Sequence, residues 1–188
     1  PRGVAAALLP LLVLKYSGML VPGLRDLYKP FGLAYYSLQL AGYLLDVWHG
    51  RTAPTSSYAR VWCYAVFFHS LTQGPFNRYN TLMPQLEAAP KTFETQRLVS
   101  GLQRSAWGYF KKFAIADRAA IVVSAAFADP ASFDRSQLIF ATVMYSFQLY
   151  ADFSGYTDIV LGMGEILGLH LPENFRQPFF SASVKELW

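Results

Sequence analysis

Long apolar stretches, each bounded by proline, glycine or charged residues, constrain this chain more than any other feature of its sequence. The long stretches cover residues 4–20, 31–48, 58–71 and 138–169, and a shorter one covers 119–127. A helix that crosses a bilayer needs about 20 mostly apolar residues, or as few as about 17. The pattern therefore predicts an all-α fold of polytopic membrane helices, with each long stretch either spanning a membrane or lying deeply buried.

The composition agrees with this interpretation without deciding it. The chain is 53% hydrophobic and 15% charged, whereas an average soluble domain carries about 25% charged residues. Its formal net charge is +4, but the basic residues are spread thinly and no motif of a nucleic-acid-binding fold is present, so we expect no nucleic-acid partner. Anionic lipid headgroups and cytoplasmic loops explain the positive charge more economically.

Residues 73–118 form a polar segment between the apolar stretches. Pro84 and Pro90 lie in it and exclude one continuous helix, so it is a loop, a re-entrant segment or a surface helix. It is also the most densely basic part of the chain, which predicts a cytoplasmic or interfacial position. Residues 107–112, Trp-Gly-Tyr-Phe-Lys-Lys, set cations beside aromatic rings, a pattern that favours membrane anchoring over substrate contact.

The last long apolar stretch is long enough for one crossing and a re-entrant half, and it carries polar residues that are costly at membrane depth. At about 100° per residue, the polar residues of this stretch fall on two opposite faces of a helix, and those of the first face lie within an arc of about 80°. The first face carries Tyr145, Gln148, Asp152 and Tyr156, and the opposite face carries Phe147, Tyr150, Ser154 and Asp158. Two interpretations remain open, a polar stripe that lines a cavity and a structural hydrogen-bond network. Gly155 lies within this stretch and could break the helix there.

Glycines follow this polar stripe, in a pattern that favours helix packing over nucleotide binding. The spacing over residues 162–168 is G-x-G-x-x-x-G and no strand precedes it, which excludes a dinucleotide loop. Gly164 and Gly168 form a G-x-x-x-G pair that is typical of close helix packing in lipid.

Catalytic and metal-binding motifs are missing from the sequence. The three histidines, His49, His69 and His170, have no second His or Glu at metal-ligand spacing, so we expect interfacial or capping roles and no metal. No nucleophile elbow, phosphate-binding loop or zinc-protease motif occurs. Local motifs alone therefore identify no enzyme.

Four segments in order resemble the membrane-bound O-acyltransferase family, and its alginate O-acetyltransferase branch in particular. They are Gln-Gly-Pro-Phe-Asn-Arg-Tyr at 73–79, Trp-Gly-Tyr-Phe-Lys-Lys-Phe-Ala-Ile-Ala-Asp-Arg at 107–118, Tyr-Ala-Asp-Phe-Ser-Gly-Tyr-Thr-Asp at 150–158 and Leu-Pro-Glu-Asn-Phe-Arg at 171–176. The resemblance extends over residues 31–188. It implies part of a ring of helices around a funnel, with re-entrant or interfacial helices, in a bacterial inner membrane that the protein crosses several times.

The resemblance also implies where the chemistry resides. In this family a histidine acts as general base on an acceptor hydroxyl, and that histidine is expected beyond Trp188, so the chain is interpreted as truncated at both ends, without a catalytic residue and inactive alone. Funnel-lining or substrate-positioning roles are implied for Gln148, Asp152, Ser154, Tyr156 and Asp158. Roles at the cytoplasmic mouth are implied for Arg78, Asn174 and Arg176.

The implied activity moves an acyl group from a cytoplasmic donor, acetyl-CoA or another acyl donor, to hydroxyls of an exported polysaccharide such as alginate, with no bound cofactor. Peptidoglycan or teichoic acid remain alternative acceptors. The implied partners are the lipid bilayer, the polysaccharide and accessory periplasmic acetyltransferase proteins. A different class stays open as well, a polytopic transporter or scaffold, because intramembrane aspartates and packed glycines also suit a substrate pathway.

Overall fold

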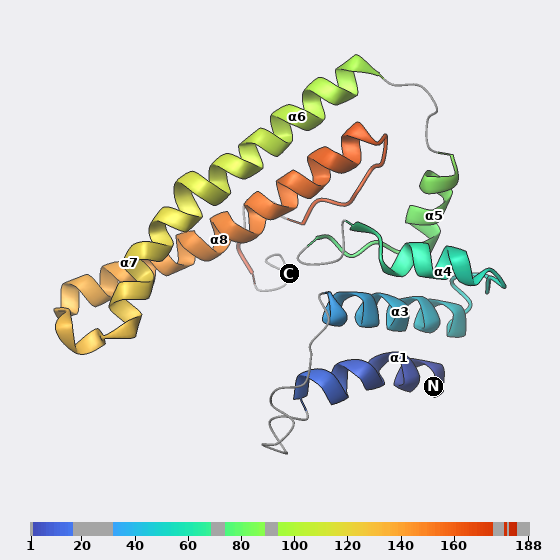
Figure 1. The fold of residues 1–188 in the computed structure, drawn as a ribbon, viewed down its shortest axis with the longest axis horizontal. Coiled ribbons are helices and arrows are strands. Elements are labelled where there is room, and N and C mark those ends of the chain that lie inside the picture. Colours follow the sequence, from blue (N-terminus) through green and yellow to red (C-terminus); the bar gives the residue numbers. More distant parts are fainter. Residues whose placement is uncertain are drawn as a thin grey trace. The chain divides into compact units, whose positions relative to one another are not determined.

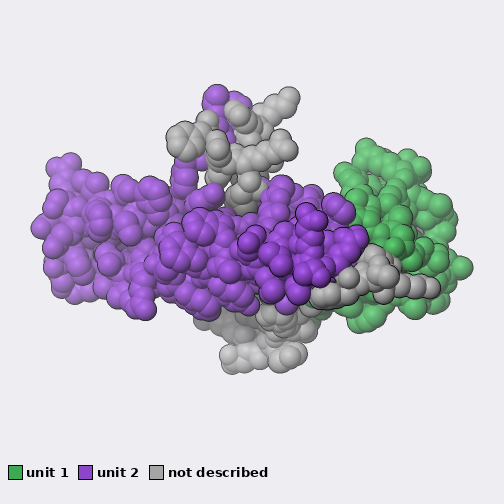
Figure 2. All heavy atoms as spheres, turned by 90° about the horizontal axis from the view of Figure 1, so that it is seen from above, with its two compact units in different colours: residues 1–91 green, residues 92–188 purple. Residues whose placement is uncertain are grey.

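The computed structural model describes residues 2–16, 32–68, 74–88, 94–174, 179 and 181–183. The chain divides into two compact units, unit 1 with residues 1–91 and unit 2 with residues 92–188, which Figure 2 draws in green and purple. Within the described residues every regular element is a helix and none is a strand, which confirms the all-α class. No helix in those residues combines the length and the apolar content needed to cross a membrane.

The described part of unit 1 contains short helices. They are α1 (Arg2–Leu11), the π-helix η1 (Leu12–Tyr16), α3 (Leu33–Trp48), α4 (Tyr58–Ala65) and α5 (Tyr79–Glu87). The apolar stretch at 31–48 is thus confirmed as one helix. The stretch at 58–71 is helical only to Ala65, where α4 ends, and residues 69–71 lie outside the described part. For the stretch at 4–20, Pro10 lies inside α1 and residues 17–20 are likewise not described.

Aromatic rings and polar caps hold unit 1 together. Tyr64 packs against Tyr43 and Tyr79, with ring centroids 6.3 and 5.3 Å away. Its hydroxyl donates to the carbonyl oxygen of Asn77 at 2.7 Å, so burying this polar ring does not strand its O–H. The Ser57 side chain accepts the backbone N–H of residue 60 and so starts α4, as an N-cap serine should.

Unit 2 is a long helical hairpin. Its first arm runs without a break through α6 (Thr95–Phe110), the π-helix η4 (Lys111–Ala116) and α7 (Asp117–Ala128). The short 3-10 helix η5 (Pro130–Ser132) turns the chain, and α8 (Arg135–Ile166) returns along the first arm (Figure 1). Asp134 starts α8 with a capping box, in which it accepts the backbone N–H groups of Ser136 and Gln137.

The π-helix η4 keeps the buried seam of the first arm pointed at α8. The buried seam residues are Gly101, Ser105, Gly108, Ala116, Ala119, Val123 and Ala126. They follow one another at intervals of three or four, but eight residues separate Gly108 from Ala116 where a regular repeat would place seven. A π-turn absorbs one extra residue, because its hydrogen bonds run from i to i+5. Because the π-helix η4 accommodates the extra residue, the buried seam stays on one face of the first arm.

Paired glycines bring the two arms of the hairpin into backbone contact. A Cβ added at Gly101 would lie 2.5 Å from the carbonyl oxygen of Gly162, and one added at Gly108 would lie 2.5 Å from that of Gly155. Each pair is reciprocal, since a Cβ at Gly155 or Gly162 would meet the carbonyl oxygen of its partner. Only residues without a side chain permit this approach.

Three predictions about unit 2 are corrected by this hairpin. Instead of a crossing and a re-entrant half, the last stretch forms a single 32-residue helix, and Gly155 lies inside it without breaking it. The shorter apolar stretch at 119–127 is confirmed as helical, because it lies in α7, which packs against α8 and ends before Asp129. The predicted pairing of Gly164 with Gly168 is wrong, because Gly168 lies beyond α8 with a left-handed φ of 75°.

The prediction that residues 73–118 are not one helix is confirmed. Helix α5 ends at Glu87 and α6 begins at Thr95, on either side of residues that the structure leaves undescribed. Pro84 itself lies inside α5. Residue 118 is no boundary, because the helix continues past it into α7.

Candidate functional site

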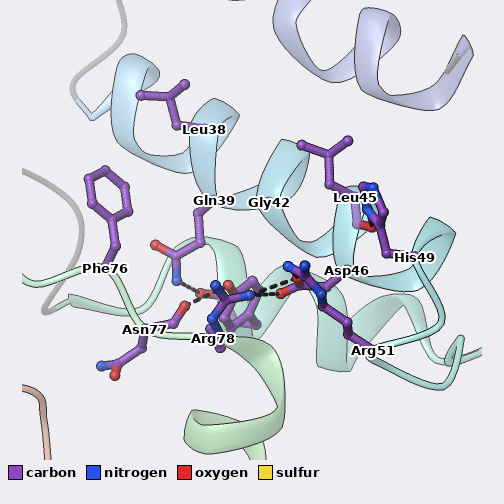
Figure 3. Close-up of a pocket in the computed structure, with 11 residues that line it drawn as sticks. Leu38, Gln39, Gly42, Leu45, Asp46, His49, Arg51, Phe76, Asn77 and Arg78 are labelled. Carbon is purple, nitrogen blue, oxygen red and sulfur yellow. Dashed lines mark hydrogen bonds and ion pairs between the residues drawn. The ribbon is translucent and has the colours of Figure 1, made fainter.

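A cavity of about 550 Å³ lies beside α3 in unit 1 (Figure 3). Its walls come from α3, from the turn that follows α3, from α4 and from the segment that leads into α5. The lining residues are Leu38, Gln39, Gly42, Leu45, Asp46, His49, Arg51, Tyr64, Phe76, Asn77 and Arg78. The cavity therefore combines an apolar rim with charged and amide groups, which is the usual makeup of a small-molecule site.

One carboxylate organises the charged side of this cavity. Asp46 lies in the last turn of α3, and Nη1 of Arg78 donates to both of its oxygens, at 2.7 and 2.9 Å. Nη1 of Arg51 lies 3.7 Å from the same carboxylate. The Asp46 side chain is 11% exposed, whereas those of Arg78 and Arg51 are 65% and 64% exposed. A nearly buried anion thus holds two guanidinium groups that still face solvent.

The position of Asp46 needs these arginines. A carboxylate near the C-terminal end of a helix meets the negative end of the helix dipole, which is electrostatically unfavourable. The two guanidinium groups offset that repulsion. Arg78 follows the buried Gly74 and Pro75 and precedes α5 as its N-cap residue, so the backbone fixes where its side chain starts.

Amide groups form the deepest wall. Gln39 is only 2% exposed, and its Nε2 donates to the carbonyl oxygen of Tyr64 at 3.0 Å. Its Oε1 is buried and has no hydrogen-bond partner among the described residues. Asn77 is buried beside it. A buried acceptor without a donor is costly unless a ligand or water supplies one.

His49 is a capping histidine, as the sequence predicts. It is the C-cap residue of α3, and its Nδ1 lies 2.7 Å from the carbonyl oxygen of Leu45. This contact places the ring proton on Nδ1. The ring forms one edge of the cavity and fixes the end of α3.

Sequence reasoning singled out Arg78 but missed its partner Asp46 and missed Gln39, which lines the same cavity. A signal for both was present in the helix period. Gln39, Tyr43 and Asp46 are four and three residues apart, which puts them on one face of α3. All three are buried, and that face looks into the core of unit 1.

Ion pairs in unit 2 tie α8 to the first arm of the hairpin. Nζ of Lys112 lies 2.5 Å from Oδ1 of Asp152 and 3.0 Å from Oδ1 of Asp117. Lys111 pairs with Asp158. Asp152 and Asp158 of α8 therefore pair with two consecutive lysines of the π-helix η4.

The sequence analysis placed Asp152 and Asp158 on opposite faces of α8, which would keep them from sharing a partner segment. In the structure, lysines of a single π-turn pair with both. Gly155, one of the glycines at which the two arms come into backbone contact, lies midway between the two aspartates in sequence. At about 100° per residue each aspartate is about 60° from the direction of Gly155, on either side of it. Both can therefore be reached by lysine side chains that extend around the contact.

Arg104 extends the network toward the end of α8. Its Nε and Nη2 lie 3.2 Å from Oδ1 of Asp158, and Nη2 donates to Glu173 at 2.6 Å. Ser100 donates to Oε1 of Glu165 at 2.5 Å one turn further along. These contacts line one side of a second, smaller cavity of about 250 Å³.

Hydrogen bonding to Asp152 and to Asp117 raises the pKa of Lys112 above its ordinary value and outweighs a small opposing effect of burial. A raised ammonium pKa means that this network stabilises the fold below the ordinary lysine pKa, and that the contribution is lost as the pH rises through the raised value. The network is therefore fully formed at neutral pH.

Comparisons with known proteins place this geometry in a family. The chain is 33% identical over 161 residues to "Probable alginate O-acetylase" of Pseudomonas putida, which covers 85% of this chain. It is 29% identical over 184 residues to peptidoglycan O-acetyltransferase of Helicobacter pylori and 26% identical over 167 residues to teichoic acid D-alanyltransferase of Bacillus subtilis. This chain belongs to the membrane-bound O-acyltransferase family. No model of a known protein family matches it.

The chain spans only part of these O-acyltransferases. The matched region is 32% of the length of the Pseudomonas putida protein, 35% of the Helicobacter pylori protein and 42% of the Bacillus subtilis protein. This acyltransferase segment therefore corresponds to about a third of the alginate O-acetylase that it matches.

The remaining positions that the family resemblance singles out in this acyltransferase segment do not share one site. Ser154 is buried and its Oγ has no partner among the described residues, as is true of Oε1 of Gln148. Tyr156 is half-buried and Asn174 is exposed. Arg176 lies outside the described residues.

The other two histidines are His170, in unit 2, and His69. His170 is exposed and borders the smaller cavity of unit 2, and His69 is not described. Across the described ranges, no three His, Cys, Asp or Glu side chains are grouped to hold a metal ion. The residues suited to hold a ligand are thus the guanidinium and amide groups of the unit 1 cavity.

Proposed function

We propose that the complete gene product containing this chain is a membrane O-acyltransferase that moves an acetyl group from a cytoplasmic donor, such as acetyl-CoA, to hydroxyls of an exported polysaccharide such as alginate. The observation that carries this proposal is 33% identity to an alginate O-acetylase across 85% of the chain. Two further relatives, named for transfer to peptidoglycan and to teichoic acid, support acyl transfer to a cell-envelope polymer.

The proposed reaction exchanges one acyl bond for another. A sugar hydroxyl attacks the carbonyl carbon of the acyl thioester, a base takes the hydroxyl proton, and the thiolate leaves and is protonated. A general base within hydrogen-bond reach of the hydroxyl is required. We propose that a histidine outside this chain supplies that base, as the family resemblance implies, because His49 is engaged at the end of α3.

This segment would supply structure and ligand contacts to that reaction. Exposed aromatic residues beside the lysines of η4, Trp107, Phe110 and Phe113, support placing the hairpin against a bilayer. We propose a multi-pass position in the bacterial inner membrane, as part of a ring of helices around a funnel. Gln148, Ser154 and Tyr156 would face that funnel, and the polysaccharide and accessory periplasmic acetyltransferase proteins would be the partners.

The test is complementation in a bacterium that makes alginate but lacks its own alginate O-acetylase. Expression of the complete gene product should restore acetyl esters on the secreted polymer, measured by proton NMR. If the protein accumulates in the membrane at the level of the host enzyme and alginate stays unacetylated, the proposal fails. Acetyl esters on peptidoglycan instead would keep the reaction class and replace the acceptor.

A further inference from the structure

The cavity of unit 1 has the features of an oxyanion site. We propose that the cavity beside Asp46, Arg51 and Arg78 binds a ligand that carries a phosphate or carboxylate next to a hydrogen-bond donor. The proposal goes beyond acyl transfer and depends on the proposed function only for the choice of probes. Neither relatives nor motifs assign a ligand to these residues.

Charge is the first argument. Two guanidinium groups and one carboxylate leave a local excess of positive charge at the cavity wall. The carboxylate of Asp46 is engaged by Arg78 and Arg51. Each guanidinium carries five N–H donors, so donors remain that Asp46 does not accept. Among the described residues no second carboxylate pairs with either arginine. The unused donors suit an anion whose oxygens accept several hydrogen bonds.

Preorganisation is the second argument. Free arginine side chains lose rotamer entropy when they bind an anion. Here Asp46 already holds Arg78 through two hydrogen bonds, and the backbone N–H of Arg51 donates to the carbonyl oxygen of Asp46 at 2.8 Å. Figure 3 shows both arginine side chains reaching toward this carboxylate. The two cations are therefore brought together before any ligand arrives.

Gln39 supplies the third argument and narrows the ligand. Its Oε1 is a buried acceptor without a partner in the described part of unit 1, and the residue lines the cavity. A bare anion cannot form a hydrogen bond with Oε1 of Gln39, because both groups are acceptors. A hydroxyl or amide N–H next to the anion would satisfy this oxygen while the anion meets the arginines.

Two substrates of the proposed reaction carry this chemistry, and the cavity of about 550 Å³ has room for a fragment of either. An acyl thioester donor such as acetyl-CoA has phosphates near hydroxyl and amide groups. A polymer of uronic acids has a carboxylate beside ring hydroxyls. The proposal is the chemistry that both share, an anionic group beside a hydrogen-bond donor. Binding measurements distinguish the acyl donor from the polymer.

The experiment measures binding to the complete gene product, purified in detergent, by isothermal titration calorimetry. The probes are coenzyme A, a trimer of mannuronic acid and inorganic sulfate, which has no hydrogen-bond donor. We expect coenzyme A or the trimer to bind, with an affinity that falls as salt is added. Arg51→Gln should weaken that binding about tenfold or more, because it removes a charge-assisted hydrogen bond.

Matched variants separate ligand contact from folding. Arg60→Gln removes a cation of the same unit that pairs with Glu87 outside the cavity, and should leave binding unchanged. Arg78→Lys keeps the charge beside Asp46 but loses the planar fork, and should weaken binding several-fold. Gln39→Met removes the buried acceptor, and should weaken the hydroxyl-bearing probe without changing sulfate binding.

Defined outcomes overturn the inference. It fails if neither coenzyme A nor the trimer binds, or if Arg51→Gln and Arg78→Lys both bind the probe as the unaltered protein does while remaining folded. Failure of binding with alginate acetylation intact would leave the proposed function standing. Arginine-dependent binding without acetylation would instead retain the site and refute the function.

Discussion

Unit 1 and unit 2 use the same kinds of charged side chain for different purposes. In unit 1, Asp46 is nearly buried while the guanidinium groups that it holds remain about two-thirds exposed at a cavity. In unit 2, Lys111 and Asp158 are 13% and 17% exposed, respectively, and pair beside one of the close backbone contacts of the hairpin. The comparison teaches that surroundings decide the role. Cations that keep free donors at a cavity can bind a ligand, and cations enclosed by two helices hold those helices together.

The largest expected effect comes from filling the glycine seam of unit 2. Gly155→Val should destabilise the protein by about 3 kcal/mol, because a Cβ there would lie 2.8 Å from the carbonyl oxygen of Gly108. Thermal unfolding in detergent measures the loss. Gly42→Ala in unit 1 is the matched control, since nothing lies within 4 Å of the added Cβ, and it should be neutral or slightly stabilising. Equal tolerance of both changes would contradict the close packing of the hairpin.

A smaller effect should separate the two aspartates of α8. Asp158→Asn should cost about 2 kcal/mol, because it leaves the enclosed Lys111 without its carboxylate. Asp152→Asn should cost less than about 1 kcal/mol, because that pair is about one-third exposed and Lys112 keeps Asp117. Chemical denaturation of both variants measures the difference.

Acetylation assays on the same variants sharpen the comparison further. If Asp152→Asn abolished acetylation at a normal protein level, Asp152 would act at the funnel rather than as a helix staple. Loss of both acetylation and protein level would assign it to the structural network. Unchanged acetylation would remove Asp152 from the proposed funnel lining.

The smallest effect concerns the caps that start a helix in each unit. The hydrogen bond from the Ser136 hydroxyl, together with backbone N–H groups, lowers the pKa of Asp134 below its ordinary value. The carboxylate therefore stabilises α8 above the ordinary pKa, and this contribution disappears as the pH falls through the lowered value. Asp134→Asn keeps a capping side chain and should flatten this acid dependence in unfolding measurements.

The N-cap of α4 gives the contrast for that measurement. Ser57 is uncharged in the acid range, so Ser57→Ala should lower stability by a similar amount at every acidic pH. An acid dependence that persists in Asp134→Asn would show that another carboxylate is responsible.

The sequence predicted helices better than it predicted contacts. The apolar run that ends at Trp48 was expected and became α3, because the periodicity and the flanking turn residues act within a few residues. The stop before Asp129 was predicted for the same reason. The sequence did not indicate that one helix continues past residue 118, because a π-turn carries it across the change from polar to apolar sequence.

The candidate site was only partly predictable. Arg78 stood out as an arginine after Gly-Pro, but its partner Asp46 is 32 residues away and belongs to another helix. The polar stripe of α8 was visible as a pattern, whereas the lysines that neutralise Asp152 and Asp158 come from 40 and 47 residues earlier. No local signal specifies a partner at such a separation, because the packing of the intervening helices sets the distance.

By itself the sequence determined the helical class, the course of α3 and the family, since these depend on local periodicity, flanking turn residues and identity to relatives. The tertiary structure decided which glycines meet, which side of a helix a π-turn presents, and which charges are enclosed. The physical reason is that propensity and capping act within one or two turns, whereas desolvation and pairing depend on groups that only folding brings together. Asp46 and Asp158 are the same residue type on a helix, and only their neighbours make one the organiser of a cavity and the other a tie between helices.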